Sequence, residues 1–293
     1  MALRRDRRAS LLAVGLLAGL AACAGPAPTP LRSQYQSSEE RALRYHARGE
    51  LPQALQGFRD SLRWAEIADD RPAIMAQALN VGTVALALGE WSLAEQHLRK
   101  VPRVATALSD PASLLQARLG LAEIHLRRGQ FAAARTEFQQ TLDEGREQRD
   151  NGAVLAALNG LGLTYKGLGQ MHEARRSLGE AELLARSGGE KRLLATTLAN
   201  QASLALRAGE IRQAEIYLAE AVDLDRETES LPGLAHDLAL LARVRQEQGD
   251  PHEALALYRQ ARTIARHTGQ HVRAQEYAQA IDLLKRESSV PLR

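Results

Sequence analysis

Apolar residues recur at helical spacing along most of the chain, in paired runs separated by a short turn. The clearest pair spans residues 155–184, where one apolar run ends at Gly169 and a second begins at Met171. Apolar side chains every three to four positions indicate amphipathic helices, and a glycine between two such runs permits a left-handed turn. The pattern therefore predicts a hairpin of two antiparallel helices.

The same hairpin pattern recurs with a period of forty residues and without insertion or deletion. The turn position holds glycine at residues 49, 89, 129, 169, 209 and 249. Relative to each glycine there is a small residue seven positions earlier, an alanine five positions later and a large apolar residue nine positions later, as with Gly162, Ala174 and Leu178 around Gly169. Small residues let two helix backbones approach closely, and the large side chains fill the space against the next hairpin. The chain is thus expected to form six stacked hairpins.

This pattern resembles that of the tetratricopeptide repeat family. In the fourth unit the family's Leu-Gly, Tyr, Gly, Ala and Ala positions are occupied by Leu161, Gly162, Tyr165, Gly169, Ala174 and Ala181. The usual period is about 34 residues; forty is similar to the longer-helix variant found in kinesin light chains and in bacterial peptide-binding regulators. HEAT and armadillo repeats have a comparable length, but their pattern does not require alanine five residues after glycine. The resemblance implies an all-α, right-handed superhelical solenoid of six helix-turn-helix repeats plus a C-terminal capping helix.

The solenoid is expected to occupy residues 37–293. Turn and N-cap residues between the apolar runs, such as Asp69 with Asp70 and Ser109 with Asp110, delimit the repeats. Their predicted ranges are about 37–70, 71–109, 110–150, 151–189, 190–230 and 231–269, followed by a capping helix at 270–286. In that last segment Asp282 stands where the six repeats have Ala or Gly, which fits the polar outer face that a terminal repeat requires.

The amino terminus resembles a bacterial lipoprotein signal peptide. Four arginines between residues 4 and 8 precede an apolar run from Leu11 to Leu20, and Leu-Ala-Ala-Cys closes the segment at Cys23. The apolar run is shorter than the roughly 20 residues of a membrane-spanning helix, so it predicts a cleaved export segment over residues 1–22. An ordinary secretory signal with a coincidental cysteine is one alternative, and twin-arginine export through Arg7 and Arg8 is another.

Under the lipoprotein interpretation, Cys23 is lipidated and anchors the protein to a membrane. Ala24 follows it, which by resemblance to the known sorting rule favours the outer membrane of a Gram-negative envelope, facing the periplasm. Residues 23–36 contain Pro26, Pro28 and Pro30 and are expected to form an extended, semi-rigid tether. Cys23 is the only cysteine, so the chain can form no internal disulfide.

Processing also changes the net charge. The full chain carries 38 Lys and Arg against 35 Asp and Glu, a formal charge of +3. Removal of residues 1–22 deletes four Arg and one Asp and leaves a formally neutral chain. The high isoelectric point is therefore no argument for a nucleic-acid partner, and none is expected.

The sequence contains no recognisable catalytic constellation, so we expect a protein without enzymatic activity and without a cofactor. The pairs at His172 and His252, each followed by Glu, lack the second histidine of a zinc-protease motif. His267 and His271 are four residues apart, but Gly269 between them is expected to break the helix, so no metal site is predicted. Trp64 and Trp91 are interpreted as packing residues.

The resemblance also implies that the first helix of each hairpin lines a binding groove. Asparagines nine or ten residues before the turn glycine resemble those with which peptide-binding arrays hold a peptide backbone, and cations two or three residues before it could bind carboxylates. The candidate groove residues are Asn80, Thr83, Glu123, Arg127, Asn159, Lys166, Asn200, Ser203, Arg207 and Arg243. The alternative is that these are solvated polar residues on helix surfaces, with the asparagines capping locally.

These features together predict a membrane-anchored envelope adaptor whose solenoid binds a segment of a partner protein. A narrower hypothesis is an assembly factor similar to the lipoproteins that escort an outer-membrane pilus or secretion complex. The alternative is a solenoid that senses a small ligand or a signal peptide, as long-helix arrays do in some regulators.

Overall fold

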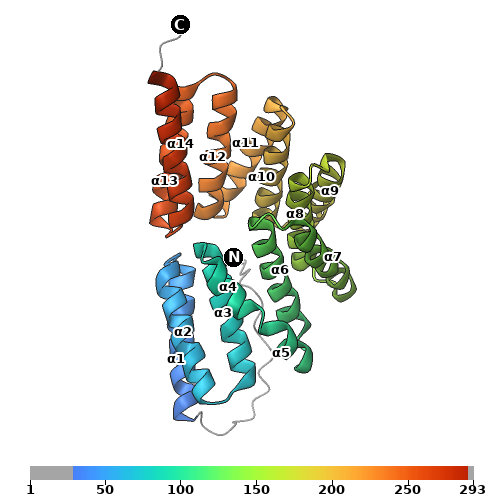
Figure 1. Cartoon of the computed structure of the whole chain (residues 1–293), viewed down its shortest axis with the longest axis vertical. Helices are drawn as coiled ribbons and strands as arrows, with labels where there is room; N and C mark the ends of the chain where they lie inside the picture. Colours follow the sequence, from blue (N-terminus) through green and yellow to red (C-terminus); the bar gives the residue numbers. More distant parts are fainter. Residues whose placement is uncertain (1–28, 290–293) are drawn as a thin grey trace, which may run out of the picture.

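The structure is a computed structural model that describes residues 29–289 (Figure 1). All regular elements in this range are α-helices, so the predicted all-α solenoid is confirmed. No helix in this range is long and apolar enough to cross a membrane. The helices are α1 (Pro30–Ala47), α2 (Leu51–Ile67), α3 (Arg71–Leu88), α4 (Trp91–Leu98), α5 (Val101–Ala107), α6 (Pro111–Arg127), α7 (Phe131–Gln148), α8 (Asn151–Gly167), α9 (Met171–Gly188), α10 (Lys191–Arg207), α11 (Ile211–Glu227), α12 (Leu231–Glu247), α13 (Pro251–His267) and α14 (His271–Ser289).

Successive helices pack as antiparallel hairpins, and each hairpin stacks on the next. The first helices are α1, α3, α6, α8, α10 and α12, and α14 follows as an unpaired first helix. The signal peptide predicted at 1–22, the lipidated Cys23 and the tether up to residue 28 lie outside the described residues.

The helices are separated by residues in the left-handed conformation, which recur every twenty residues. The predicted turn glycines adopt it, with φ between 71° and 81° for the six of them. The junctions between repeats adopt it as well, and most of these are not glycine: the residues are Asp69, Ser109, Arg149, Gly189, Glu229 and Gly269. The turn between repeats therefore has the same left-handed backbone conformation as the turn within them. This conformation costs little free energy for glycine and about 1 kcal/mol or more for other residues.

Two helix boundaries differ from the expectation. Helix α1 begins at Pro30, so residues 30–36 are helical and the extended tether predicted there is wrong for this part. Proline fits the first turn of a helix because its missing N–H would have no partner there, and Thr29 caps the helix by accepting from the Arg32 N–H at 3.3 Å. The second helix of the second repeat is interrupted at residues 99–100, because Pro102 cannot donate to a carbonyl one turn earlier.

The repeat pattern is the packing pattern of the core. All six alanines that follow the turn glycines by five residues are fully buried: Ala54, Ala94, Ala134, Ala174, Ala214 and Ala254. The glycine seven residues before the turn makes room for the large apolar residue nine residues after it. A Cβ on Gly162, for example, would lie 2.5 Å from Cγ of Leu178. Each hairpin can bury these faces only against its neighbours, so stability depends on stacking.

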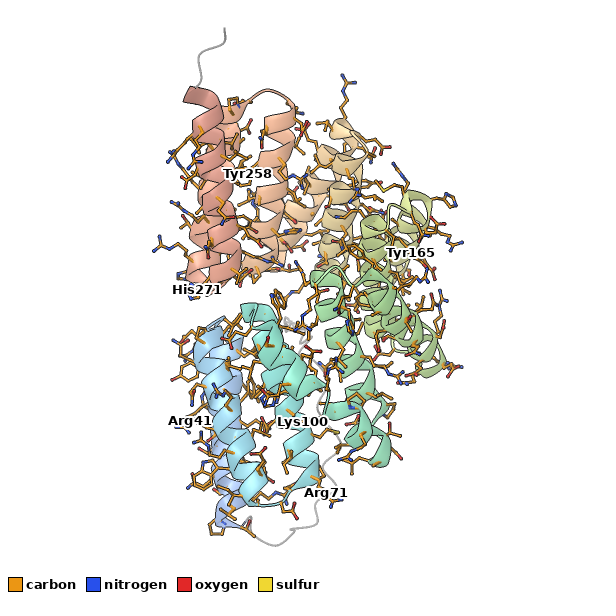
Figure 2. All side chains as sticks on the ribbon, in the orientation of Figure 1. Arg41, Arg71, Lys100, Tyr165, Tyr258 and His271 are labelled. Atoms are coloured by element: carbon orange, nitrogen blue, oxygen red, sulfur yellow. The ribbon has the colours of Figure 1, made fainter. Side chains whose placement is uncertain are left out.

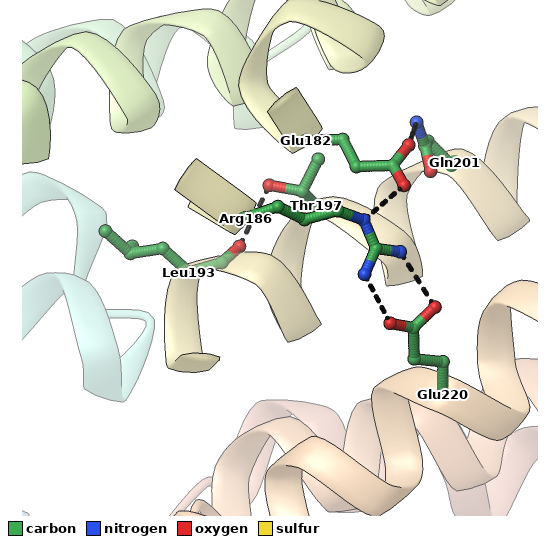
Figure 3. A network of polar contacts seen from close by, with 6 residues as sticks. All are labelled: Glu182, Arg186, Leu193, Thr197, Gln201 and Glu220. Atoms are coloured by element: carbon green, nitrogen blue, oxygen red, sulfur yellow. Dashed lines mark hydrogen bonds and ion pairs between the residues drawn. The ribbon is translucent and has the colours of Figure 1, made fainter. Parts of the chain in front are cut away.

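The outer surface carries ion pairs that join consecutive repeats. Figure 3 shows one of these networks, centred on Arg186 of α9, whose guanidinium donates to both carboxylate oxygens of Glu220 at 2.7 and 2.9 Å and to Glu182 at 2.8 Å. Glu182 also accepts from Gln201 of α10 at 2.9 Å. The bidentate contact with Arg186 holds the pKa of the Glu220 carboxyl below its usual value. Three helices are thus tied together in one register.

The chain curves until its last helices meet its first. In Figure 1, α13 and α14 stand directly above the hairpin of α1 and α2. In Figure 2, His271 marks the start of α14 at this boundary. The contact is close: a Cβ on Gly89, after α3, would lie 2.8 Å from a methyl of Val272, and one on Gly269 would lie 3.4 Å from Pro52. We call this boundary the seam; it closes the solenoid into a ring.

Two glycines within helices provide a test of the packing between repeats. A Cβ on Gly160 of α8 would overlap the ring of Phe138 in the preceding repeat, whereas one on Gly179 of α9 would meet nothing within 4 Å. We expect Gly160→Ala to lower the free energy of unfolding by about 1–3 kcal/mol, as overpacking does. Gly179→Ala should raise it by about 0.5–1 kcal/mol through helix propensity. Urea unfolding measures both, and equal effects would contradict the predicted packing.

Candidate functional site

Basic side chains from four consecutive first helices converge on the inner wall of the ring. They are Arg127 of α6, Lys166 of α8, Arg207 of α10 and Arg243 of α12, all candidates from the sequence. Lys166 is partly buried and donates from Nζ to the Ser203 hydroxyl at 2.7 Å. Burial and the charges of Arg243, Arg207 and Arg127 lower the pKa of its ammonium to about 8. The three arginines are therefore close enough for their charges to disfavour the charged form of Lys166.

The positive potential extends to His236 of α12 and Arg273 of α14. Dense packing, together with Arg273, Arg127, Lys166 and Arg243, lowers the pKa of the His236 imidazole to about 3. His236 is therefore neutral at physiological pH. Arg127 forms an ion pair with Glu123 of the same helix, with its Nε 2.6 Å from a carboxylate oxygen. No ion pair joins Arg207 or Arg243 to an acidic residue within residues 29–286.

Two adjoining cavities lie at the seam. The larger, of about 550 Å³, is lined by residues of both ends of the solenoid, among them Trp91, Arg127, Asn200 and Val272. The smaller, of about 250 Å³, is lined by Arg127, Arg243, Tyr258, Arg273 and Tyr277, and shares Arg127, His236, Arg273 and Glu276 with the larger one. Figure 2 shows Tyr258 among the C-terminal helices. We call the two together the seam cavity.

Two buried carboxyl groups line the larger part of the seam cavity. Asp225, at the end of α11, is 3% exposed and Asp237 of α12 is 1% exposed. Burial raises the pKa of Asp225 to about 6; it raises that of Asp237 to about 8, with a smaller contribution from Asp225. Oδ2 of Asp237 has no hydrogen-bond partner. Gly233, in the first turn of α12, admits the Asp225 carboxyl, which a Cβ there would overlap.

The structure brings some of the candidate groove residues to the seam cavity and leaves others apart. Thr83, Glu123, Arg127 and Asn200 line its larger part, and Arg243 lines its smaller part. Lys166, Ser203 and Arg207 lie on the adjacent wall, outside the cavity lining. Asn80 also lies outside it, and its amide donates to Gln77 at 3.4 Å.

Asn159 does not have the role expected of it. It is 6% exposed, and its amide donates to the Leu155 carbonyl at 3.0 Å and to the Thr197 hydroxyl at 2.9 Å. Its carbonyl oxygen accepts from Asn200 at 2.9 Å. A peptide could bind this amide only by breaking a satisfied buried network, which costs free energy. Asn159 therefore joins α8 to α10, and the prediction that it lies on the groove surface is wrong.

The sequence did not identify Asp225, His236, Asp237 and Arg273 as site residues. They lie on α11, α12 and α14, outside the repeat register that defined the groove, and closure at the seam brings them opposite α3 and α4. Trp91, which was expected only to pack, also lines the larger cavity. Gly269 does separate His267 from His271, with φ of 73°. No group of three or more potential metal-ligating side chains occurs in the described part of the chain.

The buried Asp237 predicts an unusual dependence of stability on pH. Its pKa is about 8 in the folded protein against 3.8 for an ordinary aspartate, so between these values the folded state holds a proton that the unfolded state has lost. Asp237 by itself therefore makes stability fall as pH rises from 4 to 8, by about 1.4 kcal/mol per unit, whereas the densely packed His236 acts in the opposite direction below about pH 6.5. Asp225 adds a weaker effect of the same sign.

Urea unfolding of the protein and of Asp237→Asn between pH 5 and pH 8 tests this. The variant should lose less stability than the parent as pH rises, and should be the more stable of the two at pH 8. Asp223→Asn, at an exposed position on α11, should keep the parent's slope. Parallel curves for the parent and Asp237→Asn would refute the assignment.

Solved structures share this fold at low sequence identity. A Rap protein complexed with Competence and Sporulation Factor has a TM-score of 0.66 at 12% identity, over 87% of this chain and 75% of that one. NprR in complex with its cognate peptide NprX has a TM-score of 0.66 at 14% identity, over 88% and 78%. Repeats of a kinesin light chain from Podosopora anserina have a TM-score of 0.52 at 18% identity, over 68% and 97%. At these identities the similarity establishes the fold alone.

The family is shown by the sequence. The tetratricopeptide repeat model matches residues 110–187, 153–227 and 193–267, three overlapping segments that together span more than half of the chain. Together with the hairpins, the buried alanines and the turn glycines, these matches establish that the chain belongs to the tetratricopeptide repeat family.

Proposed function

We propose that this protein is a non-catalytic adaptor whose inner wall binds an acidic segment of a partner protein or peptide. The observation that carries the proposal is the convergence of Arg127, Lys166, Arg207 and Arg243 on one surface. Confining these cations together is electrostatically unfavourable, as the lowered pKa of Lys166 reflects. A ligand with carboxylates would neutralise them and form charge-assisted hydrogen bonds.

The amino-terminal segment supports a second part of the proposal. Because the lipoprotein-like signal ends at Cys23, we place the adaptor at the cell envelope, anchored by lipid on Cys23 and facing the periplasm from the outer membrane. Two or more acyl chains are needed for stable anchoring, and a triacylated cysteine meets that requirement. A role in assembling an outer-membrane, pilus or secretion complex is the narrower form of this proposal.

The alternative function is a sensor of a small ligand or signal peptide. It is supported by the similarity in fold to the Rap protein and NprR, which were crystallised with Competence and Sporulation Factor and with a cognate peptide, respectively. The cavity at the seam also supports this alternative, because its volume of about 550 Å³ suits a small ligand.

Binding of an acidic segment can be measured directly with a fluorescein-labelled, Glu-rich dodecapeptide by fluorescence anisotropy. We expect Lys166→Gln and Arg207→Gln each to weaken binding by about tenfold or more, since hydrogen bonds to charged groups contribute about 1.5–3 kcal/mol. Affinity should also fall with salt. The control is Arg212→Gln, an exposed position on α11.

A purely structural role would give a different result. Lys166 is partly buried with a lowered pKa, so Lys166→Gln should leave the unfolding free energy unchanged or raised while binding is lost. If a Lys-rich peptide binds as well as the Glu-rich one, or if Arg212→Gln weakens binding equally, the proposed role of the inner wall is wrong.

The lipid anchor is tested by Cys23→Ser. Cells expressing the full-length protein or the variant are given a clickable fatty-acid analogue and then fractionated. We expect the parent to be labelled and to sediment with the outer membrane, and the variant to be unlabelled and soluble. Equal labelling of the two forms would exclude Cys23 as the attachment site, and an unlabelled, soluble parent would support an ordinary secretory signal.

A further inference from the structure

The seam cavity combines two kinds of charged surface. Its larger part is lined by the carboxyl groups of Asp225 and Asp237, and its smaller part by Arg243 and two tyrosines that the larger part lacks. Arg127 and Arg273 line both parts. The buried acids thus lie in the larger part alone, whereas guanidinium groups and the carboxylate of Glu276 line both parts.

The acidic region has an unfilled hydrogen-bonding position. Oδ2 of Asp237 has no partner although the residue is 1% exposed, and an unsatisfied buried oxygen is unfavourable enough to require an explanation. Arg192 also lines this region, but its guanidinium is engaged with the Thr228 carbonyl at 3.1 Å. A donor on a ligand is therefore the missing partner, and an ammonium group that displaces the Asp237 proton is the donor that a pair of carboxylates binds best.

The basic region has the opposite requirement. Arg243 has no ion pair among the described residues. Burial raises the pKa of the Tyr277 hydroxyl, and Arg273 beside it acts in the opposite direction. His236, between the two regions, is neutral and adds no charge of its own. Two guanidinium groups of this kind suit a carboxylate, which accepts two parallel hydrogen bonds from each.

Apolar side chains complete the cavity lining. Leu86, Trp91 and Val272 line the larger part, and its volume of about 550 Å³ falls in the usual range for ligand sites of about 300–1,000 Å³. Together with the smaller part, of about 250 Å³, the space exceeds that needed for a single amino acid and fits a peptide of a few residues.

We infer that the seam cavity is a binding site for a short peptide with free termini, whose ammonium group contacts Asp225 and Asp237 and whose carboxylate contacts Arg243 and Arg273. This site rests on the alternative function proposed above and names its ligand; it shares Arg127 and Arg243 with the inner wall, but Lys166 and Arg207 do not line it. The bound peptide contacts α3 and α4 on one side of the seam and α12 and α14 on the other. Binding therefore holds the two ends of the solenoid together and stabilises the folded ring.

The test uses a library of di- to tetrapeptides built from apolar residues, in four forms: free at both ends, N-acetylated, C-amidated and blocked at both ends. Thermal shift of the purified full-length chain and affinity selection with mass spectrometry report binding. We expect the library with both termini free to raise the melting temperature. Blocking either terminus alone should lower the affinity of the selected peptides at least tenfold. No shift with the free library, or equal binding of the doubly blocked one, would overturn the inference.

Two variants assign the ends of the peptide. Asp237→Asn should remove the preference for a free amino terminus and keep the preference for a free carboxylate, and Arg243→Gln should do the reverse. Asp223→Asn and Arg212→Gln, both exposed on α11, are the matched controls and should bind as the parent does. If either site variant retains both preferences, the assignment is wrong.

The two proposals fail separately. Lys166→Gln should leave binding of the peptide library unchanged, and Asp237→Asn should leave binding of the Glu-rich dodecapeptide unchanged. Loss of both activities in Lys166→Gln would mean that one surface serves both ligands, which would overturn the inference of a separate site.

Discussion

A left-handed residue every twenty positions is the constraint on which this structure depends. Each such residue ends one helix and turns the chain into the next, so that eleven of the fourteen helices in the described part of the chain have 17 or 18 residues and about 26 Å of length. Equal helices place the small and large core positions of every hairpin at the same height. The six buried alanines therefore occupy the same position in every hairpin.

The same regularity divides the charges between two surfaces. On the outside, ion pairs such as Arg186 with Glu220 join residues about one repeat apart, and they hold adjacent hairpins in register. On the inside, the concave wall brings first helices together and concentrates Arg127, Lys166, Arg207 and Arg243 with one acidic partner, Glu123. Ion pairs between repeats lie on the outer surface, whereas the cations within the ring have few acidic partners.

Closure of the ring creates a site that no single repeat contains. Val272 rests against Gly89, and Gly269 approaches Pro52, although more than 180 residues separate them in the chain. The buried acids Asp225 and Asp237 then face a cavity whose other wall comes from α3 and α4. Buried carboxyl groups without full hydrogen bonding lower stability, so their presence at the seam is understandable where a ligand supplies the missing donor.

The sequence by itself determined the helices, their pairing and most of their ends, because apolar periodicity, turn glycines and N-cap residues are local signals. It also identified Arg127, Lys166, Arg207 and Arg243, because the repeat register puts them on one face. It did not reveal that Glu229 and Arg149 adopt the left-handed conformation, since neither residue type favours it. Nor did it show that the Asn159 amide forms buried hydrogen bonds with Thr197 and Asn200, or that the start of α14 packs against the end of α3. Those outcomes depend on the curvature accumulated over six hairpins, which arises from side-chain packing between repeats and which only the tertiary structure decides.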